Sequence, residues 1–140
     1  MTRTMQRFQL SYGDCDTVGI AYFAIYYPWM ERTYSTWMYR NGIRTGELAE
    51  RFGIVTVGVH SEATYHRPAH VFDELTCDMV LEDFGNSSYK LGFDFRRDDE
   101  LVTHGTMTFA CRTPDDAKAA VPTTIAETLR TLDRAQRHSS

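Results

Sequence analysis

The sequence predicts an α+β domain in which an antiparallel sheet of about five strands wraps around one long helix. One long segment near the N-terminus repeats apolar residues at helical spacing, and four later segments alternate apolar and polar residues at the period of a strand. Short stretches of turn-forming residues separate these strands. At 140 residues, the whole chain (1–140) is expected to form one domain with its own hydrophobic core.

The first part of the chain is expected to hold one strand and two helices. Gln6–Tyr12 alternates, which predicts the first strand, and a loop with two glycines follows. Aromatic and apolar residues then recur at helical spacing over Ala24–Arg40. The Asn41-Gly42 pair after them is a typical helix C-terminus, because glycine accepts the left-handed conformation. Thr45–Phe52 is expected to be a second, short helix.

The second part is expected to hold the other strands and a helical tail. The strands are predicted over Val55 to Ala63 or Tyr65, Leu75–Leu81, Tyr89–Phe95 and Met107–Cys111, with turns at Asp83–Asn86 and Arg97–Glu100. Thr123–Arg137 is expected to form a polar helix that ends in a loose His-Ser-Ser. This order of elements suggests the hotdog fold as one of several α+β arrangements.

Composition excludes several partner classes. The net charge of −4 argues against nucleic acid as the main partner, because phosphate binding requires a basic surface. Cys15, Cys77 and Cys111 are odd in number and lack CxxC spacing, which argues against a disulfide framework and against a zinc site. The N-terminus has no apolar signal core, and no run approaches the ~18 apolar residues of a membrane span. We therefore expect a cytoplasmic protein that binds no membrane.

Two aspartates lie in a glycine-marked loop just before the aromatic helix, in the stretch YGDCDTVGIAYF. A carboxylate in this place most commonly caps the helix or braces the loop. The alternative is that Asp16 is a catalytic carboxylate, because the unpaired N–H groups of a helix N-terminus also stabilise an oxyanion. Asp14 is expected to brace the loop.

The segment GDCDTVGIAYFAIYYPWME resembles the active-site segment of the 4-hydroxybenzoyl-CoA thioesterase family of hotdog enzymes. The residues that match the family's pattern are Asp16, Gly19, Tyr22, Phe23, Tyr26 and Trp29. Two weaker matches are YHRPAHVFDELTCDM, with Asp73 and Leu75, and the Gly85–Ser88 turn followed by Tyr89. The resemblance extends from about Phe8 to Arg112, which is most of the chain.

The resemblance implies a role for each matched residue. Asp16 would attack the thioester carbonyl or activate water as a general base, and the sequence leaves both routes open. The backbone N–H of Phe23 would stabilise the oxyanion, and Gly19 would allow the close approach of the chain before it. Glu31 matches a helix position that contacts the substrate in the aromatic-acyl enzyme; otherwise it is an interface or solvated acid. The other substrate-binding candidates are Tyr22, Tyr26, Ser87 and Ser88.

The turn at residues 85–88 departs from the enzyme it resembles, which has a basic cluster there for nucleotide phosphates. The positive charge must therefore come from elsewhere in this chain. The available cations are Arg67, Lys90, Arg96, Arg97 and Arg112, although arginines and lysines of this kind are most often solvated surface residues. The carrier of the acyl group, CoA or an acyl-carrier phosphopantetheine, stays open.

The other reactive side chains indicate no second chemistry. Cys15 lies between two aspartates, whose charge would raise its pKa and blunt it as a nucleophile. The histidines His60, His66, His70 and His104 lack a metal-binding spacing, so no metal is expected. No cofactor is expected either, since CoA would be part of the substrate.

The resemblance thus implies an acyl-CoA thioesterase for an aromatic or short bulky acyl group. The resemblance also implies a homodimer or homotetramer, with each site built from two chains. Two alternatives are a hotdog dehydratase or hydratase, for which the His66–His70 stretch is the only hint, and a non-catalytic acyl-CoA-binding module.

Overall fold

The sheet has five antiparallel strands in the order β1-β3-β4-β5-β2. They are β1 (Gln6–Gln9), β2 (Val55–Tyr65), β3 (Glu74–Phe84), β4 (Ser88–Arg97) and β5 (Glu100–Arg112). The computed structural model describes residues 4–139, with side chains up to Leu132. The two edges of the sheet are β1 and β2, and the β2 edge is much the longer, with 11 residues.

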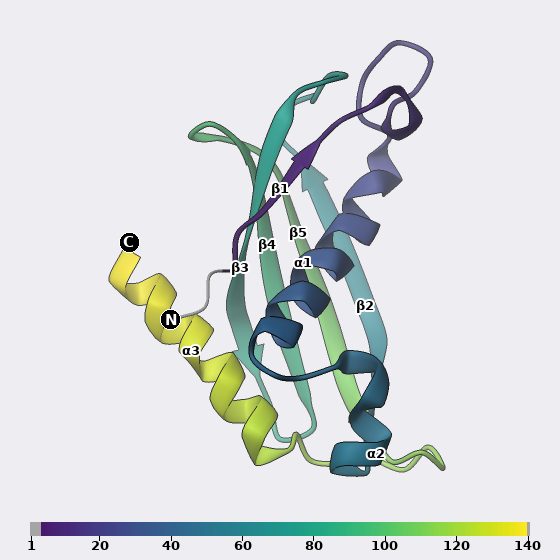
Figure 1. The fold of residues 1–140 in the computed structure, drawn as a ribbon, viewed down its shortest axis with the longest axis vertical. Coiled ribbons are helices and arrows are strands. Elements are labelled where there is room, and N and C mark those ends of the chain that lie inside the picture. Colours follow the sequence, from purple (N-terminus) through teal and green to yellow (C-terminus); the bar gives the residue numbers. More distant parts are fainter. Residues whose placement is uncertain (1–3, 140) are drawn as a thin grey trace.

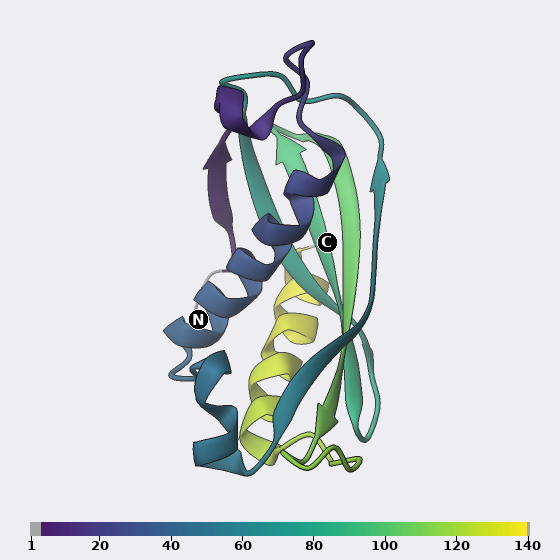
Figure 2. The same ribbon diagram turned by 90° about the vertical axis from the view of Figure 1, so that its right-hand side faces the viewer.

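One long helix lies across one face of the sheet (Figures 1 and 2). It is α1 (Tyr26–Arg40), and a 3-10 turn at Phe23–Ile25 leads into it. The short α2 (Leu48–Phe52) follows, and α3 (Thr123–Ser139) packs beside β3. The predicted hotdog arrangement, an antiparallel sheet wrapped around a central helix, is confirmed. Among the described helices, none has both the length and the apolar character that crossing a bilayer requires.

The core lies between α1 and the inner face of the sheet. The helix buries residues three or four apart, as its sequence period predicts: Tyr26, Trp29, Met30, Thr33, Tyr34, Trp37 and Met38. The central strand β4 buries alternate residues against them: Tyr89, Leu91, Phe93 and Phe95. Gly105 on β5 makes room for the helix, because a Cβ at this position would overlap the Sδ of Met30.

Both ends of the chain differ from their predicted bounds. β1 ends at Gln9 rather than Tyr12, because Tyr12–Asp14 forms a 3-10 turn. The C-terminal helix continues to Ser139, so the prediction of a loose end is wrong for residues 138 and 139, and Ser140 lies outside the described residues. No Gly or Pro interrupts this helix. It is also not simply a polar tail, because it buries Ile125, Leu129 and Leu132.

β5 begins at Glu100, seven residues before the predicted Met107. In the first half of β5, apolar and polar residues do not alternate regularly in the sequence, so the pattern does not predict a strand there. The register with β4 shifts between Phe95 and Arg96, and Gly105 contributes no side chain to the pattern. The turn between β4 and β5 is short, with Asp98 in the left-handed conformation (φ 56°).

A buried tyrosine pair joins α1 to the sheet. The hydroxyl oxygens of Tyr34 on α1 and Tyr89 on β4 lie 2.6 Å apart, and both side chains are almost fully buried. Tyr34 also stacks on Phe109 of β5, with ring centroids 4.7 Å apart. Burial raises the pKa of Tyr34 to about 12, so both hydroxyls are neutral and hydrogen-bonded at physiological pH.

Tyr34→Phe or Tyr89→Phe alone is expected to lower the free energy of unfolding by about 1–3 kcal/mol, because each leaves one buried hydroxyl without its partner. The double variant is expected to cost less than the sum, since it leaves neither hydroxyl behind. Urea unfolding of the four proteins measures the coupling. If the two single losses in unfolding free energy add up to the loss in the double variant, the two hydroxyls are not energetically coupled.

Candidate active site at the start of the central helix

Asp16 lies in a tight loop that closes on itself. Its Oδ1 accepts hydrogen bonds from the N–H groups of Val18 (3.0 Å) and Ile20 (3.2 Å), and its own N–H donates to the Ile20 carbonyl oxygen (2.9 Å). Gly19 has a φ of 78°, which glycine adopts without strain. The Oδ2 atom has no hydrogen-bond partner among the described residues, and the side chain is exposed. Asp16 therefore braces the loop through one oxygen and leaves the other accessible.

Asp14 braces the same loop, as predicted, although it bonds upstream rather than downstream. Its Oδ2 accepts hydrogen bonds from the N–H (2.9 Å) and the hydroxyl (3.2 Å) of Ser11. Its carbonyl oxygen accepts the N–H of Tyr22 (2.8 Å). These contacts close the 3-10 turn and tie it to the start of the central helix, so Asp14 is structural.

The start of the central helix lies beside a surface cleft of about 290 Å³. The cleft is lined by Ile20, Ala21, Phe23, Tyr26, Tyr65, His66, Arg67, Pro68 and Ala69. Within the described residues, no acceptor takes the backbone N–H of Phe23. The Phe23 carbonyl oxygen accepts a hydrogen bond from the Tyr65 hydroxyl (2.8 Å), which joins the helix start to the end of β2. An unpaired N–H at a helix N-terminus beside a cleft suits a developing negative charge.

The two matched tyrosines differ in exposure. Tyr22 is half exposed, with its ring 4.6 Å from the Phe23 ring. Tyr26 is buried among Trp29, Tyr65 and Phe95, and burial raises the pKa of its hydroxyl. Tyr26 therefore forms the buried part of the cleft lining, whereas Tyr22 does not line the cleft and contacts Phe23, which does.

The other predicted substrate-binding residues, Glu31, Ser87 and Ser88, lie far from Asp16 within one chain. Glu31 lies eight residues beyond Phe23 on an exposed face of the helix, about 12 Å along its axis. Ser87 lies in the β3–β4 turn and Ser88 is the first residue of β4. This turn is at the opposite end of the sheet from the loop that precedes α1 (Figure 1). Since β4 is ten residues long, the two ends are about 30 Å apart. Within one chain, these three residues therefore do not lie beside Asp16.

The five candidate cations all have carboxylate partners within the chain. The pairs are Arg67–Glu100 (3.2 Å), Lys90–Glu82 (3.9 Å), Arg96–Asp94 (3.6 Å), Arg97–Asp73 (2.8 Å) and Arg112–Asp116 (3.5 Å). None of the five is therefore an unpaired charge reserved for a phosphate group.

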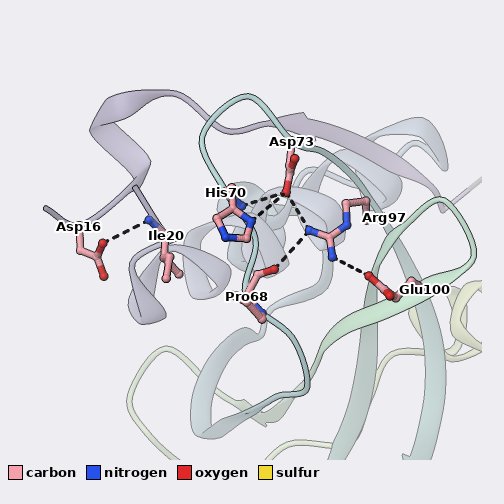
Figure 3. A network of polar contacts seen from close by, with 7 residues as sticks. All are labelled: Asp16, Ile20, Pro68, His70, Asp73, Arg97 and Glu100. Atoms are coloured by element: carbon pink, nitrogen blue, oxygen red, sulfur yellow. Dashed lines mark hydrogen bonds and ion pairs between the residues drawn. The ribbon is translucent and has the colours of Figure 1, made fainter. Parts of the chain in front are cut away.

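The loop between β2 and β3 supports the site, and its contacts are not evident from the sequence. Its backbone pairs with the Asp16 loop through Ala21 N–H to the Ala69 carbonyl (2.8 Å) and Val71 N–H to the Gly19 carbonyl (3.1 Å). Asp73 accepts the His70 N–H (2.9 Å) and binds Arg97 (Figure 3). Partial burial raises the pKa of Asp73, but these two donors outweigh it and the net shift is downward. In the sequence, the HRPAH…D pattern is the only feature that points to this loop as part of the site.

Neither a reactive thiol nor a metal site is evident around Asp16 in the described part of the chain. Partial burial raises the pKa of the Cys15 thiol, and the carboxylates of Asp14, Asp16 and Asp73 raise it further. It is therefore a weak nucleophile at neutral pH. Over the part of the chain that the structure describes, no group of His, Cys, Asp and Glu side chains is arranged to hold a metal ion.

Comparison with known proteins points to one family. Residues 18–104 match the family model of the thioesterase superfamily, a match that begins just after Asp16. The chain is 26% identical over 98 residues to a 1,4-dihydroxy-2-naphthoyl-CoA hydrolase of Prochlorococcus marinus strain NATL2A, covering 65% of this chain and 63% of that protein. The corresponding hydrolase of strain MIT 9303 is 25% identical over 100 residues, with 66% of each chain covered. The chain thus spans just under two thirds of the length of these relatives.

Solved structures share the fold. A 1,4-dihydroxy-2-naphthoyl-CoA thioesterase from Synechocystis superposes with a TM-score of 0.83 at 17% identity, over 91% of this chain and 96% of that one. A gentisyl-coenzyme A thioesterase superposes with a TM-score of 0.78 at 19% identity, over 89% and 98% of the two chains. At these identities the likeness concerns the fold alone.

Proposed function

Since this chain belongs to the thioesterase superfamily, we propose that it hydrolyses an acyl-CoA thioester to the free acid and CoA. The observation that carries the proposal is the arrangement around Asp16. A carboxylate with one unpaired oxygen lies in the loop that leads to the start of the central helix, where the N–H of Phe23 is unpaired beside a cleft. This supplies a base or nucleophile and an oxyanion donor at one end of the molecule.

Two routes use the same groups. In the first, Asp16 attacks the thioester carbonyl, the thiolate of CoA leaves, and water hydrolyses the resulting mixed anhydride. In the second, Asp16 takes a proton from a water molecule as that water attacks the carbonyl. In both, the Phe23 N–H stabilises the oxyanion of the tetrahedral intermediate, and Gly19 gives the loop the conformation that places Asp16 before the helix.

We propose an aromatic or short bulky acyl group as the substrate. The lining of the cleft supports this, because Phe23, Tyr26 and Tyr65 present aromatic surface beside the helix start. The sequence relatives support it too, because their names specify 1,4-dihydroxy-2-naphthoyl-CoA, an aromatic thioester. Tyr22, half exposed beside Phe23, is the further candidate for contact with the acyl group.

We further propose that the working unit is a homodimer, alone or within a homotetramer. Glu31, Ser87 and Ser88 are remote from Asp16 in one chain, so a shared site would need a second copy. The long exposed edge of β2 is the surface at which two sheets can join.

A thioester panel tests the function. It spans aroyl, phenylacetyl, branched and straight-chain acyl-CoA, and the release of free CoA thiol is measured. We expect turnover of the aroyl and phenylacetyl thioesters to exceed that of the straight-chain ones. Hydration of an enoyl-CoA without thioester hydrolysis would identify a hydratase instead. Binding across the panel without turnover would identify a non-catalytic module.

A further inference from the structure

We propose that Arg97 is a positioning residue that holds the Asp16 loop in its working conformation from the far side of the β2–β3 loop. The inference rests on the proposed function, in which Asp16 is the reacting carboxylate. Arg97 has no bond to Asp16 (Figure 3). It does not line the cleft itself but donates to Pro68, which does, so it would act through the intervening backbone.

The guanidinium of Arg97 joins three segments at the end of β4. Its Nη1 donates to the Asp73 carboxylate (2.8 Å) and to the Pro68 carbonyl oxygen (3.2 Å), and its Nη2 donates to the Glu100 carboxylate (2.5 Å). Charge-assisted hydrogen bonds of this length are among the strong ones in proteins. A planar group with several donors can bind all three acceptors at once, which a lysine ammonium cannot do in the same geometry.

The acceptors of Arg97 bracket the part of the β2–β3 loop that contacts the Asp16 loop. Pro68 precedes this part and Asp73 follows it, so Arg97 fixes both ends. Asp73 also closes the segment internally, through its bond from the His70 N–H (2.9 Å). The enclosed residues 69–71 are the ones that pair with residues 19–21.

The β2–β3 loop also contains a strained residue next to Asp73. Phe72 has a φ of 69°, which is costly for an aromatic residue. Its N–H donates to the Leu10 carbonyl (2.8 Å), and the neighbouring Asp73 carbonyl accepts the Leu10 N–H (3.0 Å). The carboxylate of Asp73, held by Arg97, is the side-chain anchor next to the strained residue. Without this anchor, the loop would be expected to relax.

The β2–β3 loop is connected to the Asp16 carboxylate through Ile20. Ile20 lies opposite His70 in the pairing of the two loops, and its N–H donates to Asp16 Oδ1 (3.2 Å). A shift of residues 69–71 therefore displaces the segment that orients Asp16. In catalysis, a displacement of about 1 Å can cost about 100-fold in rate.

The test is Arg97→Ala, compared with Arg51→Ala. Arg51 also donates to a backbone carbonyl, that of Gly42 (2.6 Å), but it lies near α2. For Arg97→Ala we expect kcat to fall by about 100-fold with little change in KM, and added guanidinium ions to restore part of the loss. Arg97→Lys should lie between this variant and wild type. Arg51→Ala should keep the wild-type kcat and show no response to guanidinium.

Amide hydrogen exchange provides a readout that does not depend on activity. In Arg97→Ala, protection should fall in residues 16–21 and 69–71 and stay unchanged in α1 and in residues 106–112 of β5, which lie away from the Arg97–Glu100 contact. An unchanged kcat, unchanged exchange of residues 16–21, or an equal loss of protection throughout the chain would overturn the inference. If the alanine variant does not fold, Arg97→Lys and Asp73→Asn are judged by the same criteria. A wild-type protein without thioesterase activity would refute the proposed function, while the exchange data would still decide whether Arg97 orders the loop.

Discussion

Asp16→Asn is expected to lower kcat for thioester hydrolysis by about 100-fold or more while the fold and its stability are retained. An asparagine keeps an Oδ1 that can accept the Val18 and Ile20 N–H bonds, so the loop should hold its shape. What is lost is the negative charge and the accessible second oxygen. The substitution therefore separates the two uses of the carboxylate, bracing and chemistry, which Asp16→Ala would remove together.

Asp14→Asn is the matched control for this variant. Asp14 lies in the same loop, and its bonds from Ser11 can also be accepted by an amide oxygen. We expect its kcat to stay near that of wild type. Release of CoA thiol, measured on the best thioester of the panel, gives kcat, and thermal unfolding monitors the fold. Near-normal turnover by a folded Asp16→Asn protein would refute the assignment of Asp16.

The sequence predicts best those elements whose residue pattern lies within one continuous segment of the chain. The helix at Tyr26–Arg40 has a regular apolar period, and β2 alternates with few interruptions. The start of the candidate site is local too, since Asp16, Gly19 and Phe23 lie within eight residues. The competing interpretations of Asp16 turn out to be compatible, because one oxygen braces the loop while the other is unpaired.

The features that the sequence does not predict depend on contacts between distant segments. Arg97 is 24 residues from Asp73 and 29 from Pro68, and no spacing rule relates such positions. The early start of β5 is hidden by a register shift that only the pairing with β4 reveals. Glu31 matches a family position in sequence, and Ser87 and Ser88 belong to the 85–88 segment that departs from the family pattern. One chain holds all three far from Asp16, so the roles proposed for them depend on the proposed assembly of two chains.

The exposed edge of β2 is expected to be the surface on which that assembly depends. Among the described residues, β2 pairs only with β5, which leaves one row of its backbone groups without a strand partner. The strand also exposes Val57 (43%) and Val59 (58%). A long edge of this kind is a template for pairing with another strand. Two copies joined antiparallel about a twofold axis would bring the Ser87–Ser88 end of one sheet beside the Asp16 end of the other.

Val57→Lys combined with Val59→Lys is therefore expected to convert the protein to monomers and to remove most of its thioesterase activity. A charged side chain buried at such an interface raises the dissociation constant by about 30-fold or more. Neither valine belongs to the buried core, so the monomer should remain folded. Sedimentation velocity measures the assembly and CoA release measures the activity.

Tyr39→Lys is the control for this pair of substitutions, because Tyr39 is as exposed as Val59 (58%) but lies on α1. It should leave both assembly and turnover unchanged. A double-lysine variant that stays dimeric would exclude β2 as the joining edge. A folded monomer with full activity would show that one chain holds the complete site, so that Glu31, Ser87 and Ser88 would have no part in it. Loss of assembly and activity together, with the fold intact, is the result that a site shared between two chains requires.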